Sequence, residues 1–184
     1  FKKKKHLDIL IEYFKDRDKN KTHLTEEIII KNYPNDFLNK DTFLKLYNLW
    51  GYHEHGDLVL SNVRFDKNDI LIYDNENTSE SGFYFTDIST FFFSYLSGEP
   101  YLNKLWIVKL MLRFKKKSII NLVKYIAKEL NMNTEDVFIM IYFGLERKVF
   151  ICNENKEQSF EFWKNISDLY YDFLIKNKLT NYVR

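Results

Sequence analysis

The chain has 184 residues, of which 45% are hydrophobic and 29% are charged, a composition typical of a folded protein and not of a disordered one. Lysine and arginine total 28 against 26 aspartate and glutamate residues, for a net charge of +2. This small excess creates no broad field that would by itself attract nucleic acid or an anionic membrane. The single cysteine, Cys152, excludes an internal disulfide framework and a cysteine-based zinc site.

The longest apolar stretches, such as residues 137–145, fall well short of the roughly 20 residues that a membrane-spanning helix needs. We therefore expect no membrane span, and a reducing cytoplasmic location is the simpler expectation for a chain with one cysteine. No repeat or linker divides residues 1–184, so we expect a single domain. The chain opens on Phe1 and four lysines without an initiating methionine, and we expect it to be a fragment of a longer protein.

The first half of the sequence predicts three helices. Between residues 5 and 15 the apolar side chains recur at three- and four-residue spacing, the pattern of an amphipathic helix, at Leu7, Leu10, Ile11 and Phe14. A polar segment over 15–21 ends this helix. Thr25 is a candidate cap of a second, short helix, and Asp41 or Thr42 of a third, which Gly51 ends.

Residues 63–73 predict a small β-hairpin, because the turn-forming tetrad 66–69 separates Val63 and Phe65 from the apolar run 70–73, which we expect to be a short buried strand. Residues 77–82 are polar and flexible in composition. Thr86 or Asp87 can cap a following helix that runs to Leu96. Beyond Pro100, apolar spacing predicts helices over 101–114, 118–130, 134–147 and 157–178. The expected fold class is mainly α, with a small β component (α+β).

One stretch carries candidate chemistry. His55-Gly56-Asp57 lies in a short loop, Asn62 follows five residues later, and Asp74 and Glu76 follow the second hairpin strand. Phosphoryl transfer needs one carboxylate to orient a hydroxyl nucleophile and oxygen ligands to hold Mg²⁺ against the phosphates. The order of these residues fits that division, with Asp57 as the candidate base, Asn62 and Asp74 as metal ligands, and Glu76 as a further ligand to the metal or its water.

These residues resemble the catalytic half of the aminoglycoside phosphotransferase and choline kinase group, which has a protein-kinase-like fold. The resemblance covers about residues 50–96 and implies a kinase-like C-terminal lobe. It implies that Asp57 is the base, that His55 organises the loop, and that Asn62 and Asp74 bind Mg²⁺ and thereby the co-substrate ATP. It also implies a structural role for Asp87 at the start of the next helix.

Nothing in the sequence resembles the nucleotide-binding lobe of that group, which supplies a Gly-rich flap and a strand lysine. No glycine occurs between Phe1 and Trp50, so this N-terminal lobe is absent from the chain. We expect the lobe before residue 1 of the intact protein, and the alternative is a degenerate relative that no longer binds ATP.

The expected function is therefore an ATP-dependent transfer of the γ-phosphate to a hydroxyl of a small molecule, such as a sugar, an aminoglycoside or an amino alcohol. The alternative is a catalytically inactive, kinase-like helical module that binds a partner protein. A basic nucleic-acid binder is a third hypothesis, which the near-neutral charge disfavours, and we expect no nucleic-acid partner. The sequence leaves the acceptor and the oligomeric state open.

Each candidate also has an ordinary structural interpretation. Asp and Asn favour loops and turns, so Asp57, Asn62 and Asp74 could be turn residues. His53, Glu54 and His55 suggest a metal site, but no third ligand is apparent and we expect no zinc. The lysine runs Lys2–Lys5 and Lys115–Lys117 are expected to be solvated faces.

Overall fold

The computed structural model describes residues 2–17, 51–66, 69–74, 79–97 and 105–180. Within these ranges the chain forms six α-helices, one short 3₁₀-helix and two two-stranded sheets. The helices are α1 (Lys2–Arg17), α4 (Tyr84–Ser97), α5 (Leu105–Phe114), α6 (Lys116–Glu129), α7 (Thr134–Glu154) and α8 (Phe160–Asn177), and the 3₁₀-helix is η2 (Leu60–Asn62). The strands are β1 (Gly51–Glu54), β2 (Val63–Asp66), β3 (Asp69–Ile72) and β4 (Ser79–Phe83). The mainly helical architecture is confirmed.

The predicted hairpin is confirmed as the antiparallel pair β2 and β3, in which Val63 faces Ile72 and Asp66 faces Asp69. Its residues alternate between half-buried and exposed, so only one face of the hairpin meets the core. The strand predicted over 70–73 is found as β3, but the expectation that this strand is buried is wrong. The exposed side chains include Leu71 and Tyr73.

A second sheet was not predicted. β4 pairs antiparallel with β1, with Gly51 opposite Phe83, over residues that the sequence suggested were polar and flexible. The sequence Ser-Glu-Ser-Gly-Phe has little intrinsic strand preference, so this pairing depends on the partner strand.

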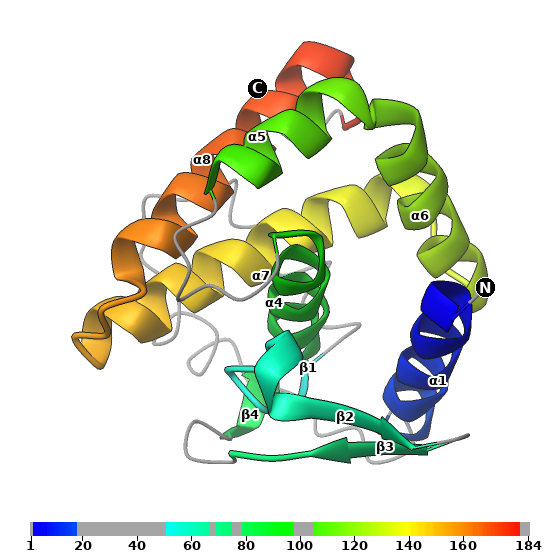
Figure 1. Cartoon of the computed structure of the whole chain (residues 1–184), viewed down its shortest axis with the longest axis vertical. Coiled ribbons are helices and arrows are strands. Elements are labelled where there is room, and N and C mark those ends of the chain that lie inside the picture. The colour runs from blue at the N-terminus through cyan, green and yellow to red at the C-terminus, as the bar shows by residue number, and fades with distance from the viewer. Residues whose placement is uncertain (1, 18–50, 67–68, 75–78, 98–104, 181–184) are drawn as a thin grey trace.

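Helix α4 lies at the centre of the described structure, and every residue from Tyr84 to Ser94 is buried. It packs against α7, α5, β1 and η2, and Figure 1 shows it standing between the strands and the long helix α7. Because α4 begins at Tyr84, directly after β4, Thr86 and Asp87 lie in its first turn and are not its caps.

The contact of α4 with α7 depends on a glycine. A Cβ at Gly144 would lie 2.1 Å from the carbonyl oxygen of Phe85 and 2.4 Å from Oγ of Ser89, both closer than van der Waals contact. The Ser89 hydroxyl also donates a hydrogen bond to the carbonyl of Ile141, at 2.8 Å. The two helix backbones therefore approach each other through small residues.

Helix α7 is the longest of the described helices, and α6 and α8 pack against it, while α5 packs against α8. The Asn133 side chain caps α7 by accepting a hydrogen bond from the amide of Glu135, in agreement with the preference of asparagine for this position. The helix continues to Glu154, beyond the predicted end at Arg147. The helices expected after Thr25 and after Asp41 or Thr42 lie outside the described residues.

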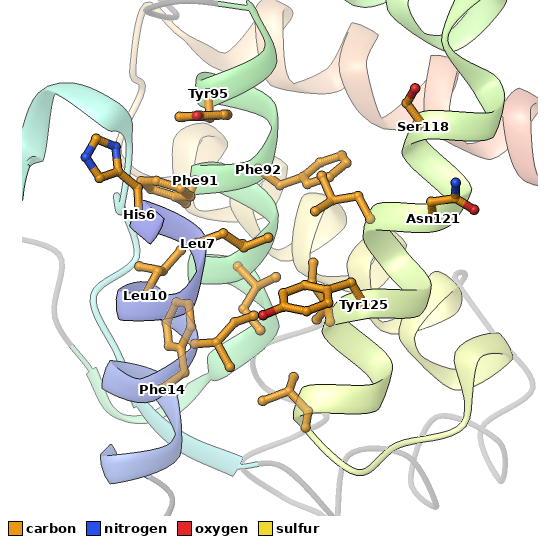
Figure 2. Close-up of a pocket in the computed structure, with 15 residues that line it drawn as sticks. His6, Leu7, Leu10, Phe14, Phe91, Phe92, Tyr95, Ser118, Asn121 and Tyr125 are labelled. Atoms are coloured by element: carbon orange, nitrogen blue, oxygen red, sulfur yellow. The ribbon is translucent and has the colours of Figure 1, made fainter. Parts of the chain in front are cut away.

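An apolar cavity of about 520 Å³ lies between α1, α4 and α6. Figure 2 shows Leu10 and Phe14 of α1, Phe92 of α4 and Tyr125 of α6 lining it. The phenol of Tyr125 donates to Asp8 of α1 and so joins two walls of the cavity.

Within the described ranges, no helix has the length and apolar character needed to cross a bilayer.

Candidate functional site

The loop after β1 is fixed to the start of α4 by a buried carboxylate. The two oxygens of Asp87 accept hydrogen bonds from consecutive backbone amides, those of His55 at 2.8 Å and of Gly56 at 2.9 Å. Asp87 is fully buried, in the first turn of α4, where the exposed amides of a helix favour a negative charge. The structural role that the resemblance implied for Asp87 is confirmed by these two contacts.

The backbone of the same loop turns at Gly56, which has φ of 77°, a conformation that favours glycine. Two further contacts fix the loop to α4. The hydroxyl of Thr90 donates to the carbonyl of Leu58, and the amide of Leu60 donates to the hydroxyl of Ser94. One helix therefore determines the path of the loop from His55 to Leu60.

His55 contacts two parts of the loop region, and its role as organiser of the loop stays a prediction. Its buried imidazole lies with Nε2 at 3.0 Å from the carbonyl oxygen of Tyr73, and its Nδ1 accepts a long hydrogen bond from the amide of Asp57, at 3.4 Å. With Nδ1 as the acceptor, the neutral ring carries its proton on Nε2 and donates it to Tyr73. The imidazole therefore links the loop to the residue that follows β3.

Asp57 and Asn62 are brought together, as predicted. The side-chain nitrogen of Asn62 lies 3.3 Å from Oδ2 of Asp57 and 3.0 Å from its carbonyl oxygen. With this nitrogen directed to Asp57, the amide oxygen of Asn62 is its remaining polar atom, and an amide oxygen is a suitable ligand for a hard cation.

Asp74 follows a residue whose backbone is bound at both ends to the loop region. The amide of Tyr73 donates to the carbonyl of Asn62, at 2.9 Å, and its carbonyl faces His55. Asp74 itself is exposed and has φ of 60°, a left-handed conformation that is uncommon outside glycine. These two contacts hold the residue before Asp74 against the loop. The role of Asp74 as a metal ligand stays a prediction.

Glu76 lies outside the described residues. Among the residues that the structure describes, no three His, Cys, Asp or Glu side chains form a group that could hold a metal ion. Glu54, which was considered with His53 and His55 as a zinc site, is instead buried against Arg147, with Oε2 at 3.2 Å from the guanidinium. This ion pair joins β1 to α7.

Lys148, which no sequence pattern indicated, supplies a cation to this site. Its ammonium is fully buried and lies 2.9 Å from Oδ1 of Asp57 and 3.4 Å from Oε2 of Glu157. Glu157 also accepts hydrogen bonds from the hydroxyl of Ser159 and the thiol of Cys152. The end of α7 and the turn after it therefore supply a charged network to the candidate base.

Several pKa values follow from this network. Burial alone would lower the pKa of Lys148, but the acidic groups around it, Cys152, Asp57 and Glu157, outweigh burial and raise the pKa to about 12. Burial raises the pKa of the Cys152 thiol to about 12. Burial acts against the Glu157 carboxylate, yet the Lys148 ammonium and the hydrogen bonds that Glu157 accepts lower its pKa. At neutral pH Lys148 is therefore an ammonium, Glu157 a carboxylate and Cys152 a neutral thiol.

No protein-family model matches the chain, and no similar protein was found among curated proteins or solved structures.

Proposed function

We propose that this chain forms the catalytic lobe of an ATP-dependent phosphotransferase, which moves the γ-phosphate to a hydroxyl of a small molecule. We also propose that its fold is that of a kinase-like C-terminal lobe. The observation that supports it most is the loop in which Asp87 binds two successive amides and Asp57 meets Asn62. Such a rigid loop suits a reaction that depends on positioning more than on covalent chemistry.

Asp57 would orient the acceptor. An ionised carboxylate accepts hydrogen bonds and donates none, so its oxygens can receive the proton of a substrate hydroxyl and direct the hydroxyl oxygen toward the phosphorus. The carboxylate is 18% exposed, which leaves it open to a ligand from one side. Lys148 and Asn62 hold its two oxygens and so fix the direction in which a hydroxyl is bound.

The residues present fit a magnesium ion in their donor chemistry. Asn62 offers an amide oxygen and Asp74 a carboxylate, and both are ligands that a hard cation prefers; Glu76 would add a second carboxylate. Magnesium bound there would neutralise charge on the phosphates of ATP. The contribution of the chain itself is to keep the backbone of Tyr73, next to Asp74, against Asn62 and His55.

One observation favours the alternative, an inactive kinase-like module that binds a partner protein. Both oxygens of Asp57 are already engaged, one by Lys148 and the other by Asn62. In the inactive module this ion pair would be purely structural, and Asp57 would never meet a substrate. The two functions differ in whether the protein turns over ATP in the presence of an acceptor.

The test is ADP release by the intact protein with Mg²⁺ and ATP, over a panel of sugars, aminoglycosides and amino alcohols. We expect acceptor-dependent turnover that Asp57→Asn abolishes while the circular dichroism spectrum is unchanged. Asp172→Asn is the matched control, because Asp172 is an exposed acid that forms an ion pair with Lys176 at 3.1 Å. Turnover by the Asp57→Asn variant would refute the assignment, and no turnover by the wild type with any acceptor would favour the inactive module.

A further inference from the structure

Helix α5 exposes a line of apolar side chains. Trp106, Leu110 and Phe114 are 61%, 44% and 66% exposed, and their four-residue spacing places them along one face of the helix. The opposite side of α5, with Val108 and Leu112, is buried. Soluble surfaces carry single exposed apolar residues, but a contiguous line of three large ones marks a contact surface.

Cations surround this line. From Leu105 to Lys128 the sequence contains seven lysine and arginine residues and no acid. Lys109 and Arg113 are exposed on α5, and the Arg113 guanidinium lies 5.2 Å from the centre of the Phe114 ring. Three exposed lysines follow Phe114 directly: Lys115 lies between α5 and α6, and Lys116 and Lys117 begin α6. We call the surface formed by Trp106, Leu110, Phe114 and these cations the α5 face.

The neighbouring helix adds little negative charge to this surface. A shallow groove beside the α5 face is lined by Lys109, Arg113 and Lys116 together with Lys176 and Asp172 of α8. Asp172 forms an ion pair with Lys176, so the charge of the groove stays positive. Figure 1 shows α5 and the adjoining part of α8 at the end of the molecule opposite the β2 and β3 hairpin, away from the candidate site.

We propose that the α5 face binds the surface of an anionic membrane, with α5 lying parallel to it. Aromatic rings favour the headgroup level of a bilayer, and lysine and arginine beside them meet the lipid phosphates. The chain would rest on the bilayer without crossing it. This proposal is independent of the proposed function, and it gives the Lys115–Lys117 run a role beyond that of a solvated face.

Charge and shape favour a membrane over other partners. Two copies of the α5 face would bring like charges together, which opposes a symmetric dimer. Single-stranded nucleic acid would match the charge, but its bases stack on aromatic platforms, and Leu110, in the middle of the line, offers no ring. A bilayer interface accepts an aliphatic and an aromatic side chain equally well.

The test is sedimentation of the intact protein with vesicles of phosphatidylcholine, with and without phosphatidylserine. We expect binding only with phosphatidylserine, and weaker binding as the salt concentration rises. Replacing Lys115, Lys116 and Lys117 together by glutamine should weaken binding on the order of 100-fold, because each cation near an anionic surface contributes roughly fivefold. The matched control replaces three exposed lysines elsewhere, Lys5, Lys156 and Lys164, and should bind as the wild type does.

Two further variants test the apolar part. Trp106→Ser with Phe114→Ser should weaken binding as well, whereas Leu71→Ser, at an exposed leucine of the hairpin, should not. The fluorescence test uses a Trp50→Phe background, in which Trp106 and Trp163 are the remaining tryptophans. Vesicles should shift the emission of this protein to shorter wavelength, and adding Trp106→Phe should remove that shift, because Trp163 is buried and does not sense the lipid. Equal binding by the triple-lysine variant and its control would overturn the proposal. So would a preference for a single-stranded RNA over the vesicles, or self-association that depends on Trp106 without vesicle binding.

Discussion

The ammonium of Lys148 lies 2.9 Å from Oδ1 of Asp57 and joins the loop after β1 to the last turns of α7. This cation is fully buried and is shared with Glu157. Taking an ammonium out of water is costly unless carboxylates compensate for it. The position of the candidate base therefore depends on a residue that does not belong to its own loop.

Replacing Lys148 by methionine should destabilise the fold by about 3–5 kcal/mol, because two carboxylates would lose the cation that compensates their burial. Urea unfolding measures this loss. Combining Lys148→Met with Asp57→Asn and Glu157→Gln removes all three charges and should recover much of the stability. The control is Lys176→Met in the exposed pair with Asp172, where we expect a change below about 1 kcal/mol. Equal effects of the two single variants would contradict the role of Lys148.

Replacing Asp87 by alanine should leave the buried amides of His55 and Gly56 without their acceptor, at a cost of roughly 1–3 kcal/mol for each amide. Hydrogen exchange at these two amides reads out the effect directly, since both should lose protection. Asp87→Asn keeps one carbonyl oxygen and should give an intermediate result. Protection that survives in the alanine variant would show that the loop does not need this carboxylate.

Gly144→Ala should destabilise the protein by several kcal/mol, because the added Cβ would lie 2.1 Å from the carbonyl oxygen of Phe85 and would force α4 and α7 apart. Alanine otherwise favours a helix by about 1 kcal/mol over glycine, so the sign of the change is diagnostic. Asn153→Ala, at an exposed position of α7, is the control and should be neutral or stabilising. Thermal unfolding compares the two variants, and a more stable Gly144→Ala protein would contradict the close approach.

Glu146 should make stability depend on pH. Burial of its carboxyl between α7 and α8 raises the pKa to about 7, together with the nearby charge of Asp168 and against the hydrogen bond from Ser167. The unfolded chain releases this proton at a lower pH, so the folded state binds more protons between the two pKa values. The contribution of Glu146 to stability should therefore be fully present below pH 4.5, the ordinary value, and should be lost as the pH rises through 7.

The expected loss from Glu146 is on the order of 2–3 kcal/mol over that interval. Glu146→Gln should remove this part of the slope, which urea unfolding at a series of pH values measures. Glu161→Gln, at an exposed position of α8, is the control and should keep the slope of the wild type. If stability varies with pH in Glu146→Gln as it does in the wild type, the pH dependence comes from another group.

The helices and the hairpin could be predicted because their signals are local. Apolar spacing located α1 and α5 through α8 to within a few residues at most ends, and the turn residues 66–69 located the hairpin. The pairing of β4 with β1 could not be predicted, because Ser79–Phe83 is a strand only beside its partner.

The same distinction explains the candidate site. Asp57 and Asn62 are five residues apart in one loop, so their proximity follows from the sequence. The predicted helix ends at Arg147, yet Arg147 and Lys148 lie inside α7 and are buried, because Glu54 and Asp57 compensate their charges. Glu54 and Arg147 are 93 positions apart, and no local pattern relates such residues. Arg147 and Lys148 therefore connect α7 to β1 and to the loop after it.

Every residue of α4 between Tyr84 and Ser94 is buried. Asp87 and Ser94 bind the loop after β1, Ser89 contacts α7, and Phe92 lines the cavity between α1, α4 and α6. Each added or deleted residue rotates the rest of a helix by about 100°. A single-residue insertion within α4 would thus disturb its contacts with the loop, with α7 and with the cavity at the same time. Over evolution, the length of this helix should be far more constrained than the turn between β2 and β3.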